Sequence, residues 1–328
     1  MNLTDTIKFI SPAIDKKNTI LPVLDHVRIV GGYAIAYDGE LAMCCPCDLP
    51  LTASPQGWTL EKAVELLSDG YQVVQLPNGD LEFVSATKGA KRRVVVPCTT
   101  DEFPMPDFNY ANPLPAPADF KETLRALLPF CYDKEDKNRP WVNTILLRHG
   151  KAIATTVHTA AWKRSGVPLD VDVNIPRKAV EAMLATKDDP AWISCTPLRF
   201  IAIYNDGRFL STPSVATSWP KASVETLITP LIMDKDITPM LDAMSAVAGF
   251  VPKEGEFYFI DDAVATEPDG RGASCELEVP PLLKGRYIVK EWYALAAKVA
   301  KRYSLHGDVF AWRGDAIEGR YKLVKTIP

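Results

Sequence analysis

Three stretches decide the fold of this chain: TLEKAVELL at residues 59–67, PRKAVEAMLATK at 176–187 and VKEWYALAAKVAKRY at 289–303. Each stretch has apolar residues on one helical face, follows a β-rich run and precedes a hairpin pattern. Their starts are 117 and 113 residues apart. Because solenoid units have roughly 20–50 residues and longer units close their own cores, this period predicts like-folded α+β domains in a row.

The repeated unit consists of a helix, strands, a second helix and a closing hairpin. It occurs around residues 7–100, 120–213 and 237–328, which predicts three domains at 1–110, 111–225 and 226–328. The connectors FPMPDFNYANPLPAPAD at 103–119 and SVATSWPKASVETLITPLIMDKD at 214–236 lack glycine. We therefore expect both connectors to be extended and semi-rigid.

Composition is that of an ordinary soluble protein, with 47% hydrophobic and 24% charged residues. No apolar stretch approaches the roughly 18 residues of a membrane span, and Asp5 and Lys8 interrupt the start, so we expect a cytoplasmic protein without a membrane partner. Seven cysteines without a framework spacing predict reduced thiols. The net charge is only −4, so any nucleic-acid contact has to come from local clusters of basic residues.

Basic residues recur on the faces of the expected helices that are opposite to the apolar faces. In residues 289–303, helical spacing separates Lys290, Lys298 and Lys301 from the apolar side. In FKETLRALL at 120–128, Lys121 and Arg125 are placed outside the apolar stripe. A solvated surface explains one such helix, but the same polarity in several equivalent helices favours a shared polyanionic partner.

Five segments carry a family resemblance. They are ILPVLDHVRIVGGYAIAYDGELAM at 20–43, DEFPMPD at 101–107, VNTILLRHGKAIATTVHTAAW at 142–162, VDVNIPRKAVEAML at 171–184 and RYKLV at 320–324. Together with the threefold repeat, they resemble the bacterial DNA polymerase III beta subunit, the sliding clamp. The chain is shorter than typical members, which fits a phage-encoded or divergent clamp.

The resemblance implies a DNA clamp fold and a function without catalysis or cofactor. Two subunits would join head to tail as a homodimeric ring of six domains, each presenting two helices to a central hole. Such a ring would encircle double-stranded DNA without sequence preference and would tether a replicative DNA polymerase as a processivity factor during DNA replication.

The resemblance also implies DNA-facing residues. Lys17, Arg139, Arg177 and Lys178 match such positions of the family. Helical phase alone adds Lys121, Arg125, Lys290, Lys298 and Lys301. For each of these residues, an ordinary surface charge is the alternative interpretation.

Clamps bind short peptides of polymerases and clamp loaders in an apolar groove, and the resemblance places such a groove here. The matching positions are Val142, Thr155, Thr156, His158, Ala160, Pro230 and Val324. The chain departs from the family pattern at 156–160 and in its ending KTIP, which predicts an altered peptide preference. Ordinary packing remains the alternative for His158 and Val324.

Ring closure in the family joins edge strands of the first and third domains. KRRVVVP at 91–97 is a flat apolar strand flanked by cations, which predicts an edge strand that needs a partner. We expect Val94, Val95 and Val96 at the dimer interface, opposite Val247 and Phe250. An inner-strand position of Val94–Val96 is the alternative.

Two competing functions stay open. A clamp-fold adaptor or decoy would bind clamp partners without encircling DNA. A metal-dependent enzyme would use Cys44, Cys45 and Cys47 with His26, but adjacent cysteines in a strand point to opposite faces, so we expect no metal site. The sequence has no phosphate loop, nucleophile elbow or zinc-protease motif, which indicates no enzyme.

Overall fold

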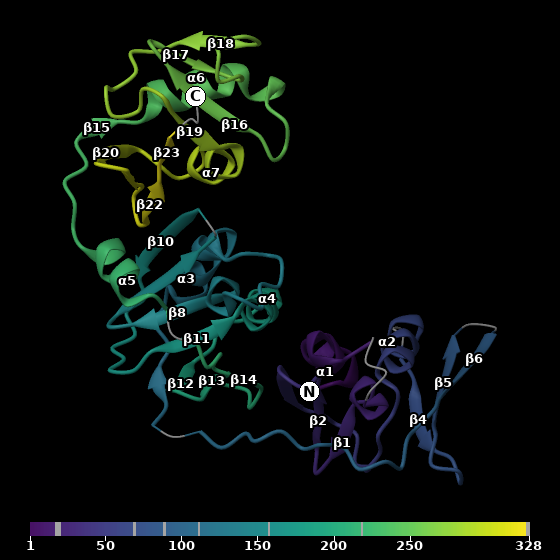
Figure 1. Cartoon of the computed structure of the whole chain (residues 1–328). Coiled ribbons are helices and arrows are strands. Elements are labelled where there is room, and N and C mark those ends of the chain that lie inside the picture. The colour runs from purple at the N-terminus through teal and green to yellow at the C-terminus, as the bar shows by residue number, and fades with distance from the viewer. Residues whose placement is uncertain are drawn as a thin grey trace. The chain divides into compact units, whose positions relative to one another are not determined.

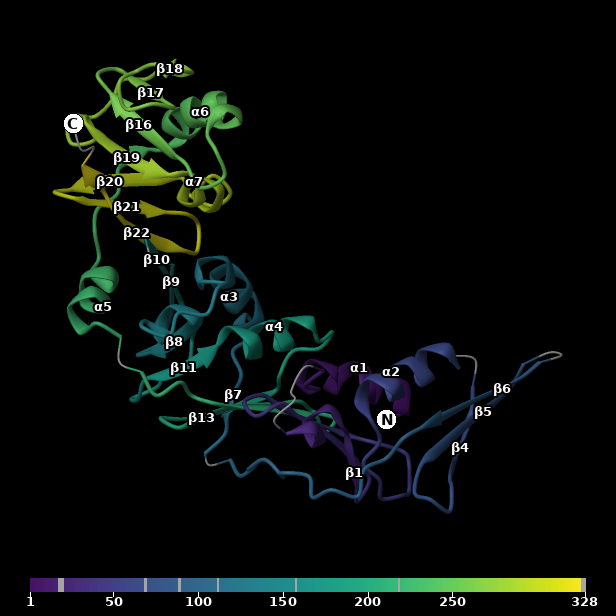
Figure 2. The ribbon, with the colours of Figure 1, turned by 45° about the vertical axis from the view of Figure 1, so that its right-hand side comes forward.

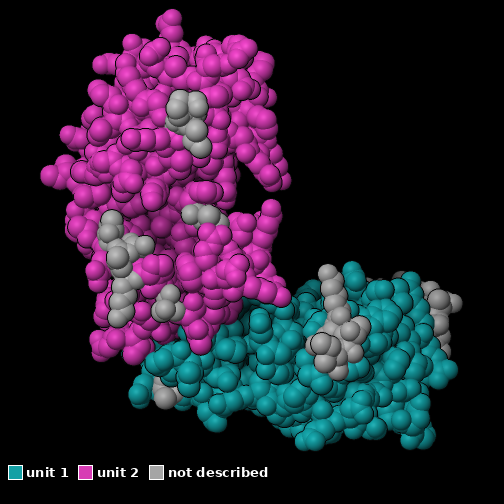
Figure 3. Space-filling view, viewed as in Figure 1, with its two compact units in different colours: residues 1–118, 178–214 teal, residues 119–177, 215–328 magenta. Residues whose placement is uncertain are grey.

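The computed structural model describes residues 1–16, 21–67, 70–87, 90–110, 112–156, 158–217 and 219–325. It contains two compact units, residues 1–118 with 178–214 and residues 119–177 with 215–328 (Figure 3). Both units consist of antiparallel sheets and short helices, so the α+β class is confirmed. None of the helices in the described ranges is long and apolar enough to cross a membrane.

The first unit contains two antiparallel sheets (Figure 1). Its elements are α1 (Leu3–Ile10), β1 (Arg28–Val30), β2 (Tyr33–Tyr37), β3 (Ala42–Pro46), α2 (Gly57–Leu66), β4 (Gln72–Gln75), β5 (Leu81–Thr87), β6 (Ala90–Val96), β7 (Leu114–Pro115), most of α4 (Arg177–Ala185), β12 (Trp192–Thr196), β13 (Arg199–Ile203) and β14 (Phe209–Pro213). One sheet has the order β1-β2-β3-β14-β13-β12-β7 and the other β4-β5-β6. Helices α1 and α2 lie side by side, and α1 also packs on β2 and β3 (Figures 1 and 2).

Helix α1 begins directly after a capping residue. The Asn2 side chain accepts a hydrogen bond of 2.9 Å from the N–H of Asp5. Leu3, Ile7 and Ile10 form its buried face. The chain then tightens into a 3-10 turn at Ser11–Ala13, where Pro12 lacks the N–H that an α-helix would need.

The second unit also contains two antiparallel sheets (Figure 2). Its elements are α3 (Phe120–Leu127), β8 (Thr144–Arg148), β9 (Lys151–Thr155), β10 (Thr159–Arg164), β11 (Val173–Pro176), α5 (Lys221–Ile228), β15 (Lys235–Asp236), α6 (Thr238–Val247), β16 (Glu256–Ile260), β17 (Ala263–Ala265), β18 (Ser274–Glu276), β19 (Arg286–Val289), α7 (Lys290–Ala296), β20 (Arg302–His306), β21 (Val309–Arg313), β22 (Glu318–Lys322) and β23 (Val324–Lys325). The strand orders are β11-β8-β9-β10-β22-β21-β20-β15 and β18-β17-β16-β19-β23.

Two sequence predictions about this unit are wrong. The helix expected across 289–303 ends at Ala296, because the N–H of Lys301 donates to the carbonyl of Arg313 and the chain enters β20. The connector 214–236 is not extended throughout, because it contains α5. Val224 and Leu227 of α5 pack into an apolar cluster with Leu146 and Ile153, and this burial favours the helix.

The sheets continue from one sequence repeat into the next. Strand β3 of the first repeat pairs with β14 of the second, and β10 of the second pairs with β22 of the third. By element order, β3, β10 and β18 are equivalent, and so are β6, β14 and β22. Strand β6 is at the edge of its sheet, as the sequence predicted, and β18 is at the edge of another.

Candidate functional site: a pocket, helix faces and open strand edges

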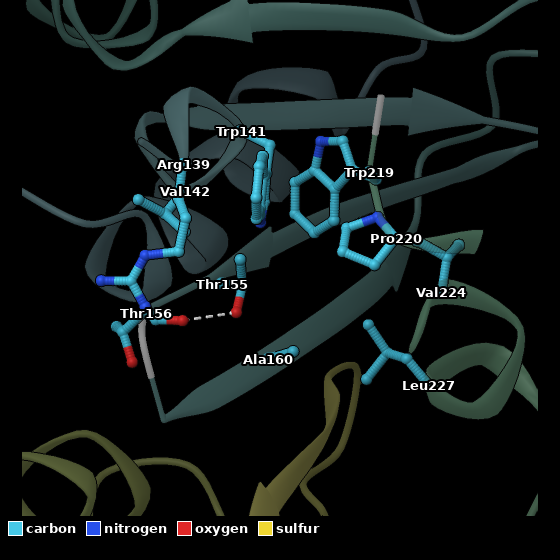
Figure 4. A pocket seen from close by; sticks show the side chains of 10 residues that line it. All are labelled: Arg139, Trp141, Val142, Thr155, Thr156, Ala160, Trp219, Pro220, Val224 and Leu227. Carbon is cyan, nitrogen blue, oxygen red and sulfur yellow. Dashed lines mark hydrogen bonds between the residues drawn. The ribbon is translucent and has the colours of Figure 1, made fainter. Parts of the chain in front are cut away.

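A pocket of about 200 Å³ lies in the second unit beside β9, β10 and α5 (Figure 4). Its lining comes from the chain before β8, from β9 and β10, and from the connector with α5. The lining residues are Arg139, Trp141, Val142, Thr155, Thr156, Ala160, Trp219, Pro220, Val224 and Leu227. Most of these side chains are apolar, so the pocket suits an apolar side chain of a ligand.

Hydrogen bonds hold the connector against the sheet on one side of the pocket. The indole N–H of Trp219 donates to Oδ1 of Asn174 at 2.9 Å. The Asn174 amide in turn donates to the carbonyls of Val215 and Thr217 at 3.0 and 3.1 Å. Because the indole is satisfied, Trp219 can be almost fully buried and present its ring to the pocket.

Arg139 supplies the charge of the pocket lining. Its Nε and Nη2 atoms lie 2.9 and 2.8 Å from Oδ2 of Asp136, and its guanidinium lies beside Thr156 (Figure 4). The hydroxyl of Thr155 donates to the carbonyl of Thr156 at 2.6 Å. The pocket therefore combines apolar walls with a cation, although the sequence had placed Arg139 among the DNA-facing residues.

The structure brings together four of the predicted groove residues: Val142, Thr155, Thr156 and Ala160. The other three, His158, Pro230 and Val324, are exposed and do not line the pocket. The prediction missed Trp141, Trp219, Pro220, Val224 and Leu227. The sequence did contain a signal for the connector residues. Trp219 and Pro220 are followed by apolar residues at 224 and 227, which is the spacing of a helix face that packs on the sheet.

The predicted basic helix faces are only partly present. Arg125 and Lys178 are exposed on α3 and α4, but Lys121 is buried at 5% exposure, so its expected outward position is wrong. Lys298 and Lys301 are exposed but follow the end of α7, so the helical phase assumed for them does not apply. Lys17 lies outside the described residues.

Charges on the six repeat helices balance. Helices α1, α2, α3, α4, α6 and α7 carry seven basic and seven acidic residues. The basic residues are Lys8, Lys62, Lys121, Arg125, Arg177, Lys178 and Lys290, and the acidic ones are Asp5, Glu61, Glu65, Glu122, Glu181, Asp242 and Glu291. The helices as a group are therefore neutral, in contrast to the expected basic surface.

Arg177 and Lys290 make equivalent packing contacts. Arg177, the first residue of α4, donates from Nη1 to the carbonyls of Leu128 and Cys131 after α3. Lys290, the first residue of α7, donates from Nζ to the carbonyls of Ala248 and Val251 after α6. Both cations interact with the negative end of the preceding helix, which gives them a structural role.

The candidate interface residues differ in exposure. In β6, Val95 is 39% exposed, Val94 is half-buried and Val96 is buried. Phe250 is 73% exposed, whereas Val247 is 2% exposed inside the core beneath α6. Val95 and Phe250 are thus available to a partner, and Val247 contributes to the fold of its own unit.

The cysteine segment is a buried part of β3. Burial raises the pKa of the Cys44 thiol to about 12 and that of the Cys45 thiol to about 11. This disfavours the thiolate form that binds metals. Within the part of the chain that the structure describes, no group of three or more His, Cys, Asp or Glu side chains is placed to hold a metal ion.

No protein-family model and no curated protein matches the sequence. Solved structures do match the fold. A putative DNA polymerase III beta subunit from Eubacterium rectale superposes with a TM-score of 0.74 at 13% identity, over 98% of this chain and 96% of that one. The beta sliding clamp of C. crescentus gives 0.73 at 16% identity, over 99% and 97%. The Helicobacter pylori beta clamp bound to a DNA ligase peptide gives 0.69 at 12% identity, over 98% of both chains. The chain therefore has the sliding-clamp fold, as the resemblance predicted.

Proposed function

We propose that this chain is a sliding clamp, in which two copies close head to tail around duplex DNA and tether a DNA polymerase during replication. The observation that supports this best is the repeated strand pairing. β3 with β14 and β10 with β22 join successive repeats in the same way, which leaves the equivalent strands β18 and β6 as edges. A head-to-tail contact between those edges repeats the same geometry and closes a ring.

The ring would have six like-folded domains, three from each copy, with boundaries at 1–110, 111–225 and 226–328. Closure would also cover two exposed strand edges, which otherwise invite uncontrolled pairing. Sedimentation equilibrium tests the assembly directly. A particle of twice the 36.2 kDa chain mass supports it, and a monomer at all concentrations contradicts it.

The DNA contacts of such a ring would be few and weak. Among the residues predicted to face DNA, Arg125 and Lys178 are exposed on α3 and α4, and Lys17 would add a third cation. A neutral set of helices gives little electrostatic attraction, so topological enclosure has to supply the retention. Weak phosphate contacts are compatible with sliding because they carry no sequence preference.

The pocket would bind an apolar side chain of a short peptide from a polymerase or a clamp loader. Its apolar lining supports this, and a clamp of the same fold is described as bound to a DNA ligase peptide. Arg139 would favour an acidic residue next to the apolar anchor.

A pocket-filling variant tests the peptide site. Ala160→Leu adds bulk to the lining and should weaken binding of a fluorescent polymerase-tail peptide by about tenfold in an anisotropy titration. Ala185→Leu, at an exposed position of α4, is the matched control. Equal affinities of both variants and the parent chain would place the peptide elsewhere.

A clamp-fold adaptor that binds clamp partners without enclosing DNA is the second candidate. The charge balance of the six helices favours it, because an adaptor needs no basic bore. Such a protein would bind the peptide through the pocket while remaining a monomer. In either case we propose a non-catalytic cytoplasmic protein.

A further inference from the structure

We infer that β6 of one copy pairs antiparallel with β18 of a second copy in one register, with Arg92 opposite Cys275 in β18 and Val95 opposite Gly272, which lies two residues before β18. This inference rests on the proposed head-to-tail ring and adds to it the residue pairs and charges of the contact. It follows from how the chain joins its own repeats.

The position of β6 is fixed by the second helix of each repeat. The residues three positions before α2, α4 and α7 are Ser54, Asn174 and Tyr287. Their partners are Thr99, Val215 and Val324, because Thr99 and Val215 donate N–H groups to the carbonyls of Ser54 and Asn174, and Val324 pairs with Tyr287. The residues four positions before these partners, Val95, Ser211 and Arg320, are therefore equivalent.

The position of β18 is fixed by hairpins of equal length. In the three repeats, residue pairs thirteen positions apart face each other: Tyr33 with Pro46, Lys151 with Arg164, and Ala263 with Glu276. Counting nine residues onward from the first member of each pair gives Ala42, Ala160 and Gly272. These three positions are equivalent, and each holds a small residue.

The register observed at the two internal junctions can now be transferred. Ser211 pairs with Ala42 at the first junction, and Arg320 pairs with Ala160 at the second. The corresponding pair at the open edges is Val95 with Gly272. Antiparallel pairing then places Val94 opposite Ala273, Arg93 opposite Ser274 and Arg92 opposite Cys275.

Side-chain directions agree with this register. Arg92 donates from Nη1 to the carbonyl of Leu66 at the end of α2, so it points to the helix-covered side of its sheet. At the first junction the equivalents of Arg92 and Cys275 are Arg208 and Cys45. Arg208 lies over the Phe9 ring of α1, and the positive charge of Arg208 influences the Cys45 thiol. The proposed register therefore places an arginine opposite a cysteine on the helix side, as at the first junction.

The two open edges carry charges of opposite sign. β6 presents exposed Arg92 and Arg93, whereas β18 presents exposed Glu276. Arg93, which also makes an ion pair with Glu82 of its own chain, would be the diagonal neighbour of Glu276 on the same face, within reach of a long side chain. The contact between copies is therefore charge-assisted, and its dissociation should increase with salt.

A single substitution tests the register, because Cys275 is already present and free. Arg92→Cys should form a disulfide with Cys275 of a second copy under mild oxidation, since directly opposed residues have Cα atoms about 4.5–5.5 Å apart. Cross-links at both contacts of a closed ring yield a dimer band on a non-reducing gel, whereas an open chain yields a ladder. Arg92→Cys combined with Cys275→Ser should abolish the band.

Arg93→Cys is the matched control, because its thiol would face Ser274 on the opposite side of the sheet. A cross-linked dimer from Arg92→Cys in large excess over that from Arg93→Cys supports the register. Equal yields from both variants overturn the register. If sedimentation still shows a dimer, the proposed ring itself is not contradicted. A monomer in sedimentation together with no cross-link from either variant overturns the ring as well.

Discussion

Helices α4 and α7 occupy equivalent places in the second and third repeats but present different surfaces. Both begin with a cation, Arg177 or Lys290, that donates to carbonyls at the end of the preceding helix. The next residue is exposed in both helices, but it is Lys178 in α4 and Glu291 in α7. The first position is therefore set by packing, and the second is open to selection for a partner.

Arg177 and Lys178 have different roles, although the sequence predicted the same role for both. Arg177 and Lys178 are adjacent cations at the start of α4, and the family resemblance predicted a DNA-facing position for both. The structure gives Arg177 two backbone acceptors, whereas Lys178 makes an ion pair with Asp38 and keeps an exposed side chain. In the proposed clamp, surface contacts with DNA should thus depend on the second positions of α4 and α7.

Loss of the Arg177 contacts should have the largest effect. Arg177→Met keeps the length of the side chain but leaves the carbonyls of Leu128 and Cys131 without this donor. We expect the free energy of unfolding in urea to fall by about 2–3 kcal/mol, as for hydrogen bonds to charged groups. Lys178→Met removes only the ion pair with Asp38 and should cost less, about 1 kcal/mol, and equal losses would refute the division of roles.

Lys290→Met should destabilise the third repeat through the same mechanism. The ammonium group donates to Ala248 and Val251, and its loss should cost about 1.5–2 kcal/mol in urea unfolding. Glu291→Gln is the neighbouring control. An unchanged urea midpoint for Lys290→Met would mean that α7 matches α4 in position but that the contacts of Lys290 do not stabilise the fold.

Lys178→Gln tests the DNA contact of α4. The substitution removes one positive charge, and the neutral glutamine, unlike a glutamate, is not repelled by Asp38. Binding to duplex DNA should weaken equally for unrelated sequences, and the slope of log affinity against log salt should fall by about one. An unchanged slope would place Lys178 away from the phosphates.

Glu291→Lys should produce the smallest effect, in the opposite direction. It gives α7 the cation that α4 has at the equivalent position, so duplex affinity at low salt should rise by about twofold to fivefold. Titration of labelled duplex measures the change. If affinity does not rise, the third repeat does not present α7 to DNA.

Sequence periodicity predicted the helices of the repeats but not their ends. Lys121 has the spacing of an outer residue and is buried, because periodicity does not include what packs around a helix. Helix α7 stops at Ala296 because residues near Lys301 pair with β21, a partner distant in the sequence. The same limit applies to the pocket. Its β-strand residues were predicted, but Trp219 joins them only after the connector folds back.

Topological retention tests the central claim most directly. Diluted chains are concentrated in the presence of nicked circular plasmid, so that dimers close around the DNA, and salt is then raised to remove phosphate contacts. Gel filtration should show protein that stays with the circular plasmid and leaves after a restriction enzyme linearises it. Equal retention on both forms, or complete loss from both, would contradict encirclement.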